Sequence, residues 1–202
     1  MPLWLADRPL VLASKSEIRR ALLADAGIPV DVSPADIDER GIEERAATRD
    51  AGAIALVLAR AKAQAIAARL PGRLVLGADQ TLALGERRFS KPADRAAARD
   101  QLKALRGQTH ELHTAVALAR DGAVAFEHHE VARLTMRAFS DGFLESYLDA
   151  MGGMVTASVG GYQLEKAGVQ LFERIDGDHF VILGLPLVAL LAYLRRAGCL
   201  AQ

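Results

Sequence analysis

Cysteine is nearly absent from this chain: Cys199 is the only one in 202 residues. A single thiol excludes an internal disulfide and a zinc site built from several cysteines, and it fits a reducing compartment. We interpret Cys199 as a small apolar residue near the end of the last helix. An excess of charge of one sign is also missing, because 25 basic and 25 acidic residues cancel. No global field draws such a chain onto nucleic acid or anionic lipid, so a bound anion must be held by a local cluster.

Long apolar runs are absent as well. The longest, residues 180–194, is interrupted by Gly184 and Pro186 and is shorter than the roughly 20 residues of a membrane helix. We expect a buried strand, a turn and a helix there. The first eight residues contain Asp7 and no basic segment followed by an apolar stretch, so no signal peptide is expected. The sequence therefore predicts a cytoplasmic protein without a membrane or nucleic-acid partner.

The standard motifs of nucleotide and hydrolase chemistry are missing. The chain has no G-x-x-x-x-G-K-[ST] loop, no strand-linked G-x-G-x-x-G and no G-x-S-x-G elbow. The five histidines show no metal-ligand spacing such as H-E-x-x-H, and we expect His128 and His129 on the surface of a hairpin.

Apolar runs and turn residues predict alternating strands and helices through the first half of the chain and a long hairpin in the second half. This order favours an α/β fold with a mixed sheet. The expected strands are 10–13, 28–33, 74–78, 111–119, 124–137 and 171–175, and the expected helices are 16–27, 49–70, 94–105, 140–151 and 186–198.

A polar segment follows the first expected strand and opens the first helix. Its residues, 14–20, combine two serine hydroxyls with the guanidinium of Arg19 at a helix start, where an anion is favoured. The same segment is also that of an ordinary helix start, because Ser16 can cap the helix without any ligand.

Asp79 stands at the expected carboxyl end of the strand 74–78. Ligands of α/β sheets gather at that edge, although a turn or helix-capping role explains a lone aspartate equally well. Lys62 and Lys91 have the ordinary interpretation of solvated surface lysines, and Glu39 that of a solubilising acidic residue.

Nine segments together favour a functional role for these polar residues over capping and surface roles, because their residues and order resemble the Maf family of nucleoside triphosphate pyrophosphatases. They are LASKSEIRRALL (12–23), DIDE (36–39), LARAKA (58–63), LGADQ (76–80), KP (91–92), LRGQTH (105–110), GY (161–162), LFERIDG (171–177) and GLPL (184–187).

The resemblance implies the inosine-triphosphatase-like α/β fold, an elongated mixed sheet flanked by helices with two lobes around a cleft, as a single domain over residues 1–202. It implies hydrolysis of a nucleoside triphosphate to the monophosphate and pyrophosphate, a house-cleaning of non-standard nucleotides, and a homodimer. Asp79 matches the catalytic acidic residue of the family. The other polar cleft positions of the family are matched by Ser14, Arg19, Glu39, Lys62 and Lys91.

These residue types suit a triphosphate. Arg19, Lys62 and Lys91 would offset its negative charge, and a guanidinium can bind two oxygens at once. Asp79 and Glu39 are hard oxygen ligands for a divalent metal cation, Mg²⁺ or Mn²⁺. Asp79 could act as the base that activates water, as a metal ligand, or as both.

Three positions bear on the nucleobase. Ile18 departs from the common family opening S-x-S-P-R-R, and it lacks the aromatic ring often found there in the 7-methyl-GTP branch. Gln80, Glu165 and the segment 171–174 resemble that branch. An ionised Glu165 only accepts hydrogen bonds, which suits the N1–H and N2–H₂ donors of guanine, and a carboxylate favours a cationic methylated purine. An exposed Glu165–Lys166 pair is the alternative interpretation.

We therefore expect a pyrophosphatase that acts on 7-methyl-GTP. A pyrophosphatase directed to dTTP and UTP, or one of broad range, is the alternative within the same class. A non-catalytic regulator of septum formation or cell division is the alternative from another class.

Overall fold

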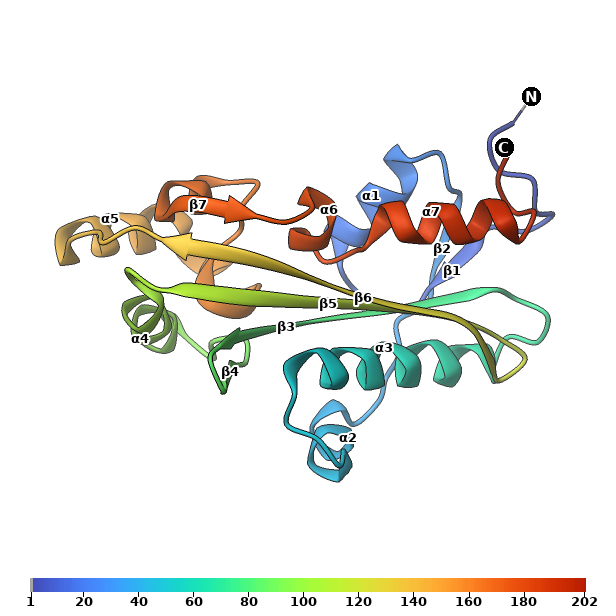
Figure 1. The fold of residues 1–202 in the computed structure, drawn as a ribbon, viewed down its shortest axis with the longest axis horizontal. Helices are drawn as coiled ribbons and strands as arrows, with labels where there is room; N and C mark the ends of the chain where they lie inside the picture. The colour runs from blue at the N-terminus through green and yellow to red at the C-terminus, as the bar shows by residue number, and fades with distance from the viewer. Residues whose placement is uncertain (1) are drawn as a thin grey trace. The chain divides into compact units, whose positions relative to one another are not determined.

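The computed structural model describes residues 2–202 (Figure 1). The strands and helices of the chain form two compact units. The first unit comprises the chain up to Gln80 together with Thr114–Glu130 and His179–Gln202, and the second comprises Thr81–His113 and Val131–Asp178. Seven strands pair in one mixed sheet, in the order β2-β1-β3-β5-β6-β7 with β4 beside β3. This confirms the predicted α/β class with helices flanking a mixed sheet, and the two units agree with the two expected lobes. The single domain over 1–202 stays a prediction.

Three strands contribute residues to both units: β3 (Val75–Leu84), β5 (Thr109–Arg120) and β6 (Ala123–Met136). The remaining elements of the first unit are β1 (Leu10–Leu12), α1 (Glu17–Asp25), β2 (Val30–Val32), α2 (Glu39–Arg45), α3 (Ala51–Ala67), α6 (His179–Ile182) and α7 (Leu187–Arg196). Those of the second are β4 (Arg87–Phe89), α4 (Arg95–Leu105), α5 (Asp141–Met151), β7 (Phe172–Asp176) and the 3₁₀ helices Gly152–Thr156, Val159–Gly161 and Ala167–Leu171.

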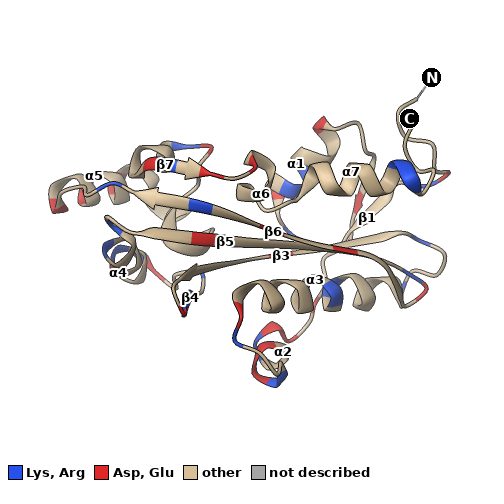
Figure 2. Ribbon diagram, in the orientation of Figure 1, with Lys and Arg blue, Asp and Glu red and all other residues tan. Residues whose placement is uncertain are grey.

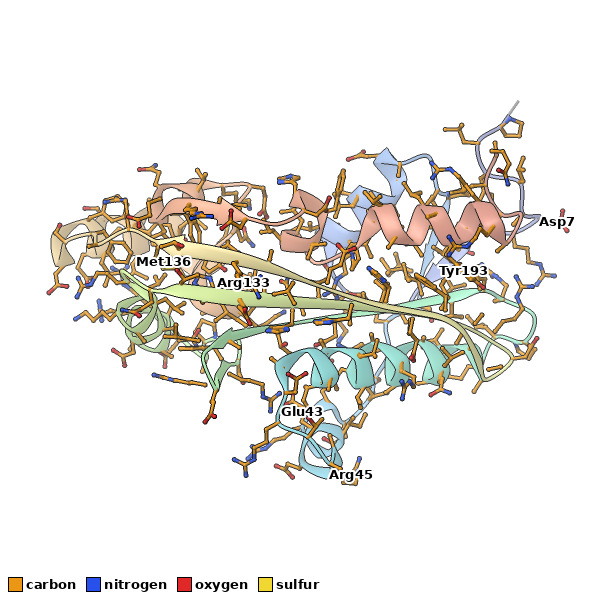
Figure 3. All side chains as sticks on the ribbon, in the orientation of Figure 1. Asp7, Glu43, Arg45, Arg133, Met136 and Tyr193 are labelled. Carbon is orange, nitrogen blue, oxygen red and sulfur yellow. The ribbon has the colours of Figure 1, made fainter. Side chains whose placement is uncertain are left out.

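The sheet of the first unit is covered on both faces. Alternate residues of β1 and β3 point to opposite sides, so Val11 and Val75 pack against α3, whereas Leu12 and Leu76 pack with α1 and α7. Figure 1 shows α3 and α7 on opposite faces of these strands. Tyr193 projects from α7 toward the sheet in Figure 3. Strands buried on both faces read as continuous apolar runs, which is why the sequence predicted them well.

Close packing of α3 on β3 depends on Gly77. A Cβ atom at this position would lie 2.0 Å from the carbonyl oxygen of Ala59 and 2.6 Å from the backbone nitrogen of Ala63. The facing residues of the helix are alanines as well, including Ala55 and Ala67. The backbone of the helix therefore rests almost directly on the backbone of the strand.

Charges of both signs are interspersed along the chain in Figure 2. On α2, for example, Arg40 pairs with Glu44 at 3.0 Å. Within residues 2–202, no helix is both long and apolar enough to cross a membrane.

Some expectations for individual elements were wrong. The segment after Asp178 forms the short helix α6 and not a strand, because the backbone N–H groups of residues 183–185 donate to carbonyls of residues 179–181 in the same segment. The strand that carries Asp79 continues to Leu84, since residues 82–84 pair with β4. Helix α2, which was not among the expected helices, begins at Glu39 and is capped by Asp38. Cys199 is buried and follows the end of α7 by three residues. His128, which was expected on the surface, is half-buried, and its Nε2 atom lies 2.7 Å from Glu130 Oε1.

An aromatic cluster lies in the second unit. The imidazole of His110 is fully buried, and its Nε2 atom lies 2.7 Å from the hydroxyl of Tyr162. Its Nδ1 atom has no hydrogen-bond partner among the described residues. Phe172 completes the cluster, with its ring 5.9 Å from that of His110 and 4.9 Å from that of Tyr162. Burial lowers the pKa of His110 to about 4, so the ring is neutral at pH 7.

We expect Gly77→Ala to destabilise the protein by about 3 kcal/mol, because α3 must move away from β3 to admit the methyl group. Chemical denaturation measures this loss. Gly142→Ala on α5 is the matched control, because the nearest atom to its methyl group is Ser140 Oγ at an ordinary contact distance of 3.9 Å, and helix propensity favours alanine. Equal stability of the two variants would contradict the packing described here.

Acidification should destabilise the protein through His110. Its pKa is lower in the folded chain than in the unfolded chain, so the unfolded state binds more protons below about pH 6.5, and stability falls as the pH drops toward 4. We expect this residue to reduce the free energy of unfolding by about 2 kcal/mol between pH 7 and pH 5. The measurement is urea unfolding at both values, and His110→Gln should lack that part of the change. An identical pH dependence of the two proteins would refute it.

Candidate active site

The polar turn between β1 and α1 places two serine hydroxyls at the start of the helix. Ser14 is buried, and its Oγ atom accepts a hydrogen bond from the backbone N–H of Ser16 at 3.2 Å. Ser16 caps α1 by accepting from the backbone N–H of Arg19 at 3.3 Å. The expected strand–serine–helix junction is therefore present, and Ser16 has the capping role that was its alternative interpretation.

Arg19 is held in one orientation by three acceptors. Its Nε atom donates to the carbonyl of Gly184 at 2.7 Å, and its Nη1 atom donates to the carbonyl of Ala78 at 3.0 Å and to Ser14 Oγ at 3.2 Å. Burial lowers the pKa of Arg19, and the charges of Asp79 and Glu39 act in the opposite direction. Nη2 is the guanidinium nitrogen without a hydrogen-bond partner among residues 2–202, and it remains available to an anion.

Lys62 of α3 connects two carboxylates. Its ammonium lies 2.6 Å from Asp79 Oδ1 and 2.9 Å from Glu39 Oε1. Lys62 and Asp79 are buried, whereas half of the Glu39 side chain is exposed. An ammonium and a carboxylate out of contact with water interact far more strongly than an exposed pair. The interpretation of Lys62 as a solvated lysine was therefore wrong.

Asp79 lies in the middle of β3 and not at its end, which corrects the sequence-based placement. The neighbouring parallel strand is shorter, however: Leu12, the last residue of β1, pairs with Leu76. Asp79 is thus three residues beyond the end of its parallel partner, on the side where Ser14 follows β1. The ligand-binding edge that we expected is therefore formed by the carboxyl end of β1, whereas β3 continues beyond that edge.

Gln80 projects to the face opposite Asp79, as alternation along a strand requires. Its Nε2 atom lies 2.9 Å from Thr114 Oγ1 and 3.0 Å from each of the carbonyl oxygens of Val181 and Ile182. The hydroxyl of Thr114 also donates to the carbonyl of Val181, at 2.8 Å.

Ile18 is the chain neighbour of Arg19, but neither Ile18 nor Lys91 nor Glu165 shares the hydrogen bonds and ion pairs of the cluster described above. Ile18 is half-buried on α1 and lines an open groove together with Ile28, Pro29 and Val30, the first residue of β2. Lys91 and Glu165 belong to the second unit, and both are exposed. The charge of Glu165, after burial, contributes to a raised pKa of Tyr147 in the same unit. The polar cluster of the first unit therefore contains five predicted residues, which are Ser14, Arg19, Glu39, Lys62 and Asp79, and Ile18 and Gln80 belong to the same unit.

Two carboxylates could hold a metal ion in this cluster. Asp79 and Glu39 share one ammonium ion, which shows that their oxygens converge on a cation. The described part of the chain contains no group of three or more His, Cys, Asp and Glu side chains suited to a metal. Two carboxylates fit Mg²⁺ or Mn²⁺ if water and phosphate oxygens complete the coordination, which is how Mg²⁺ binds at nucleotide sites.

Sequence reasoning missed Thr114 and the role of Gly184. Thr114 is fully buried and lies 34 residues from Gln80, so no local pattern connects the two. Gly184 has a φ of +96°, and a Cβ atom there would lie 3.3 Å from Arg19 Nε. Its position between an apolar run and Pro186 was the available signal, which we interpreted as a simple turn.

Comparison with known proteins places the chain in a family. It is 56% identical over 201 residues to a protein of Rhodopseudomonas palustris (strain BisB18) named nucleoside triphosphate pyrophosphatase, with all of both chains covered. It is 50% identical over 195 residues to a protein of Mesorhizobium japonicum named 7-methyl-GTP pyrophosphatase, which covers 95% of this chain and 97% of that protein.

A solved structure of a HAM1 protein from Coxiella burnetii is similar with a TM-score of 0.42 and 17% identity, over 65% of this chain and 74% of that one. The sequence model described as Maf-like protein matches residues 9–197. The chain belongs to the Maf family.

Proposed function

We propose that this chain is a nucleoside triphosphate pyrophosphatase that acts on 7-methyl-GTP and releases pyrophosphate. Full-length relatives more than half identical to it are named for the general activity, and one relative at 50% identity is named for the methylated substrate. The observation that carries the proposal is the buried contact of Lys62 with Asp79, beside an oriented Arg19.

Asp79 is the residue that would activate water. Lys62 holds Oδ1, and Oδ2 has no hydrogen-bond partner among residues 2–202, so this oxygen can orient a water molecule or accept its proton. The water oxygen bonds to the α-phosphorus while the bond from that phosphorus to the bridging oxygen breaks. The bridging oxygen leaves with pyrophosphate, and the products are the nucleoside monophosphate and pyrophosphate.

The cationic groups would stabilise the charge of the leaving pyrophosphate. Arg19 can direct Nη2 at a phosphate oxygen, since its other nitrogens are fixed by carbonyls of the protein. Lys91 is an exposed cation on the second unit that matches the family pattern. A divalent metal between Asp79, Glu39 and the phosphates would supply further charge neutralisation, and Lys62 would then keep the two carboxylates in place.

Recognition of the base is assigned to Glu165. A carboxylate accepts hydrogen bonds from the N1–H and N2–H₂ groups of guanine, and its charge favours the cationic 7-methyl purine. Ile18 offers no aromatic face for stacking on that cation, so the carboxylate is the group in this chain on which the preference depends.

A panel of 7-methyl-GTP, GTP, dTTP and UTP with Mg²⁺ or Mn²⁺, followed by pyrophosphate release, tests this proposal. We expect 7-methyl-GTP to have the highest kcat/KM, and Glu165→Gln to reduce its advantage over dTTP by about tenfold, the equivalent of one hydrogen bond to a charged group. Glu86→Gln in an exposed turn is the control, with an unchanged ratio. Faster cleavage of dTTP and UTP by the wild type would favour the pyrimidine-directed or broad-range alternative.

The non-catalytic alternative is separated by Asp79→Asn. The amide oxygen of asparagine can still accept a hydrogen bond from Lys62, so the fold should remain while kcat falls by about 10²–10⁴-fold. Steady-state pyrophosphate release and a thermal melt measure both effects, and Asp100→Asn on α4 provides the control. Full hydrolysis by the Asp79 variant would contradict the catalytic assignment.

A further inference from the structure

Helix α6 ends in a turn in which the carbonyl groups of Val181, Ile182 and Gly184 accept hydrogen bonds from side chains. The backbone N–H of Leu185 donates to the carbonyl of Phe180 at 2.9 Å, and that of Gly184 donates to Val181 at 3.0 Å. With Gly184 at a φ of +96°, these bonds form a Schellman motif. The last carbonyls of such a helix form its negative end and require donors from elsewhere.

Those donors come from three elements of the first unit. Gln80 of β3 supplies its Nε2 hydrogens to the carbonyls of Val181 and Ile182, and Thr114 of β5 donates to Val181 as well. Arg19 of α1 donates to Gly184. The turn is therefore held on one side by Gln80 and Thr114 and on the other side by the guanidinium of the site.

The amide donors of Gln80 are fully used in this arrangement. A carboxamide has two N–H hydrogens, and three acceptors lie within 3.0 Å of the nitrogen. The side chain also points away from the face that carries Asp79 and Lys62. A direct donor contact from Gln80 to a nucleobase would break bonds that close the end of α6.

We propose that Gln80 is a positioning residue for phosphate binding: with Thr114 it fixes the α6 turn, and the Gly184 carbonyl in turn fixes the guanidinium of Arg19. A guanidinium whose Nε and Nη1 atoms are anchored has little freedom left, so Nη2 is presented in one direction. The inference rests on the proposed function only in that the bound anion is taken to be a triphosphate chain.

Gln80→Met tests this role, because methionine has nearly the same length and no donor. The Val181 and Ile182 carbonyls lose a partner, the turn loosens, and Arg19 loses its fixed orientation. We expect the dissociation constant of inorganic tripolyphosphate, measured by calorimetry on the full chain, to rise about tenfold. The kcat/KM values for 7-methyl-GTP and dTTP should fall by the same factor, which leaves their ratio unchanged.

Two further variants make the test specific. In an Arg19→Lys background, Gln80→Met should have no additional effect on tripolyphosphate binding, because lysine has no fork for Gly184 to orient. Gln64→Met is the matched control, since its amide also holds a backbone carbonyl, that of Gly122 at 3.2 Å, but at the hairpin turn. If Gln80→Met does not fold, Thr114→Val removes the hydroxyl that supports the same turn.

Two results would overturn the inference. A changed ratio of 7-methyl-GTP to dTTP with unchanged tripolyphosphate binding would show that Gln80 reads the base directly. A lower melting temperature with unaltered binding and kinetics would show a purely structural role. Failure of the proposed function is distinguishable from both, because the wild-type protein would then cleave none of the nucleotides, while tripolyphosphate binding could still be compared among the variants.

Discussion

The contact of the Lys62 ammonium with the Asp79 carboxylate is the interaction around which the candidate site is arranged. Removing two charges from water costs several kcal/mol per ion, and mutual attraction offsets this cost only when the geometry is good. A pair of this kind is a weak source of stability. Its value lies in the fixed place it gives to Asp79 Oδ1, which leaves the second oxygen for chemistry, and in the link to Glu39 on a different helix.

Successive residues of β3 serve the two faces of the sheet. Asp79 turns to α3 and meets the cation, and Gln80 turns to α6 and meets backbone carbonyls. Arg19 connects the two sides because it donates to the carbonyl of Ala78, directly before Asp79, and to Gly184 at the end of α6. A short stretch of one strand thereby sets both the acidic and the basic part of the site.

The sequence predicted this fold well where local chemistry decides the outcome. The cap at Ser16, the long hairpin and the apolar strands follow from nearby residues alone. It failed where partners are distant. Local patterns alone gave Lys62 the interpretation of a solvated lysine, because the carboxylates that it contacts are 17 and 23 positions away, and the family resemblance was needed to group it with them. The extension of β3 beyond Asp79 depends on pairing with β4.

The expected preference for 7-methyl-GTP draws on residues of both units and stays a prediction, as does the role of each site residue. Glu165 and Lys91 were singled out by their match to a family pattern, and no periodicity or capping rule bears on what an exposed carboxylate or ammonium touches. The fold class could be predicted from the sequence because buried strands and helices leave apolar runs of characteristic length and spacing. Base recognition leaves no such pattern, because a few hydrogen bonds decide it.

Gly77, which faces the turn of α3 that carries Lys62, has a consequence for any redesign of this protein. With Gly77 against the backbone of Ala59 and Ala63, the spacing between helix and strand is a contact of main chains, and no side chain can be trimmed or enlarged to adjust it. Larger apolar residues, a usual means of raising thermal tolerance, cannot be introduced between α3 and β3 at this point. A change in the distance between the cation at position 62 and the Asp79 carboxylate must instead come from the ends of α3 or from the length of the side chain at position 62.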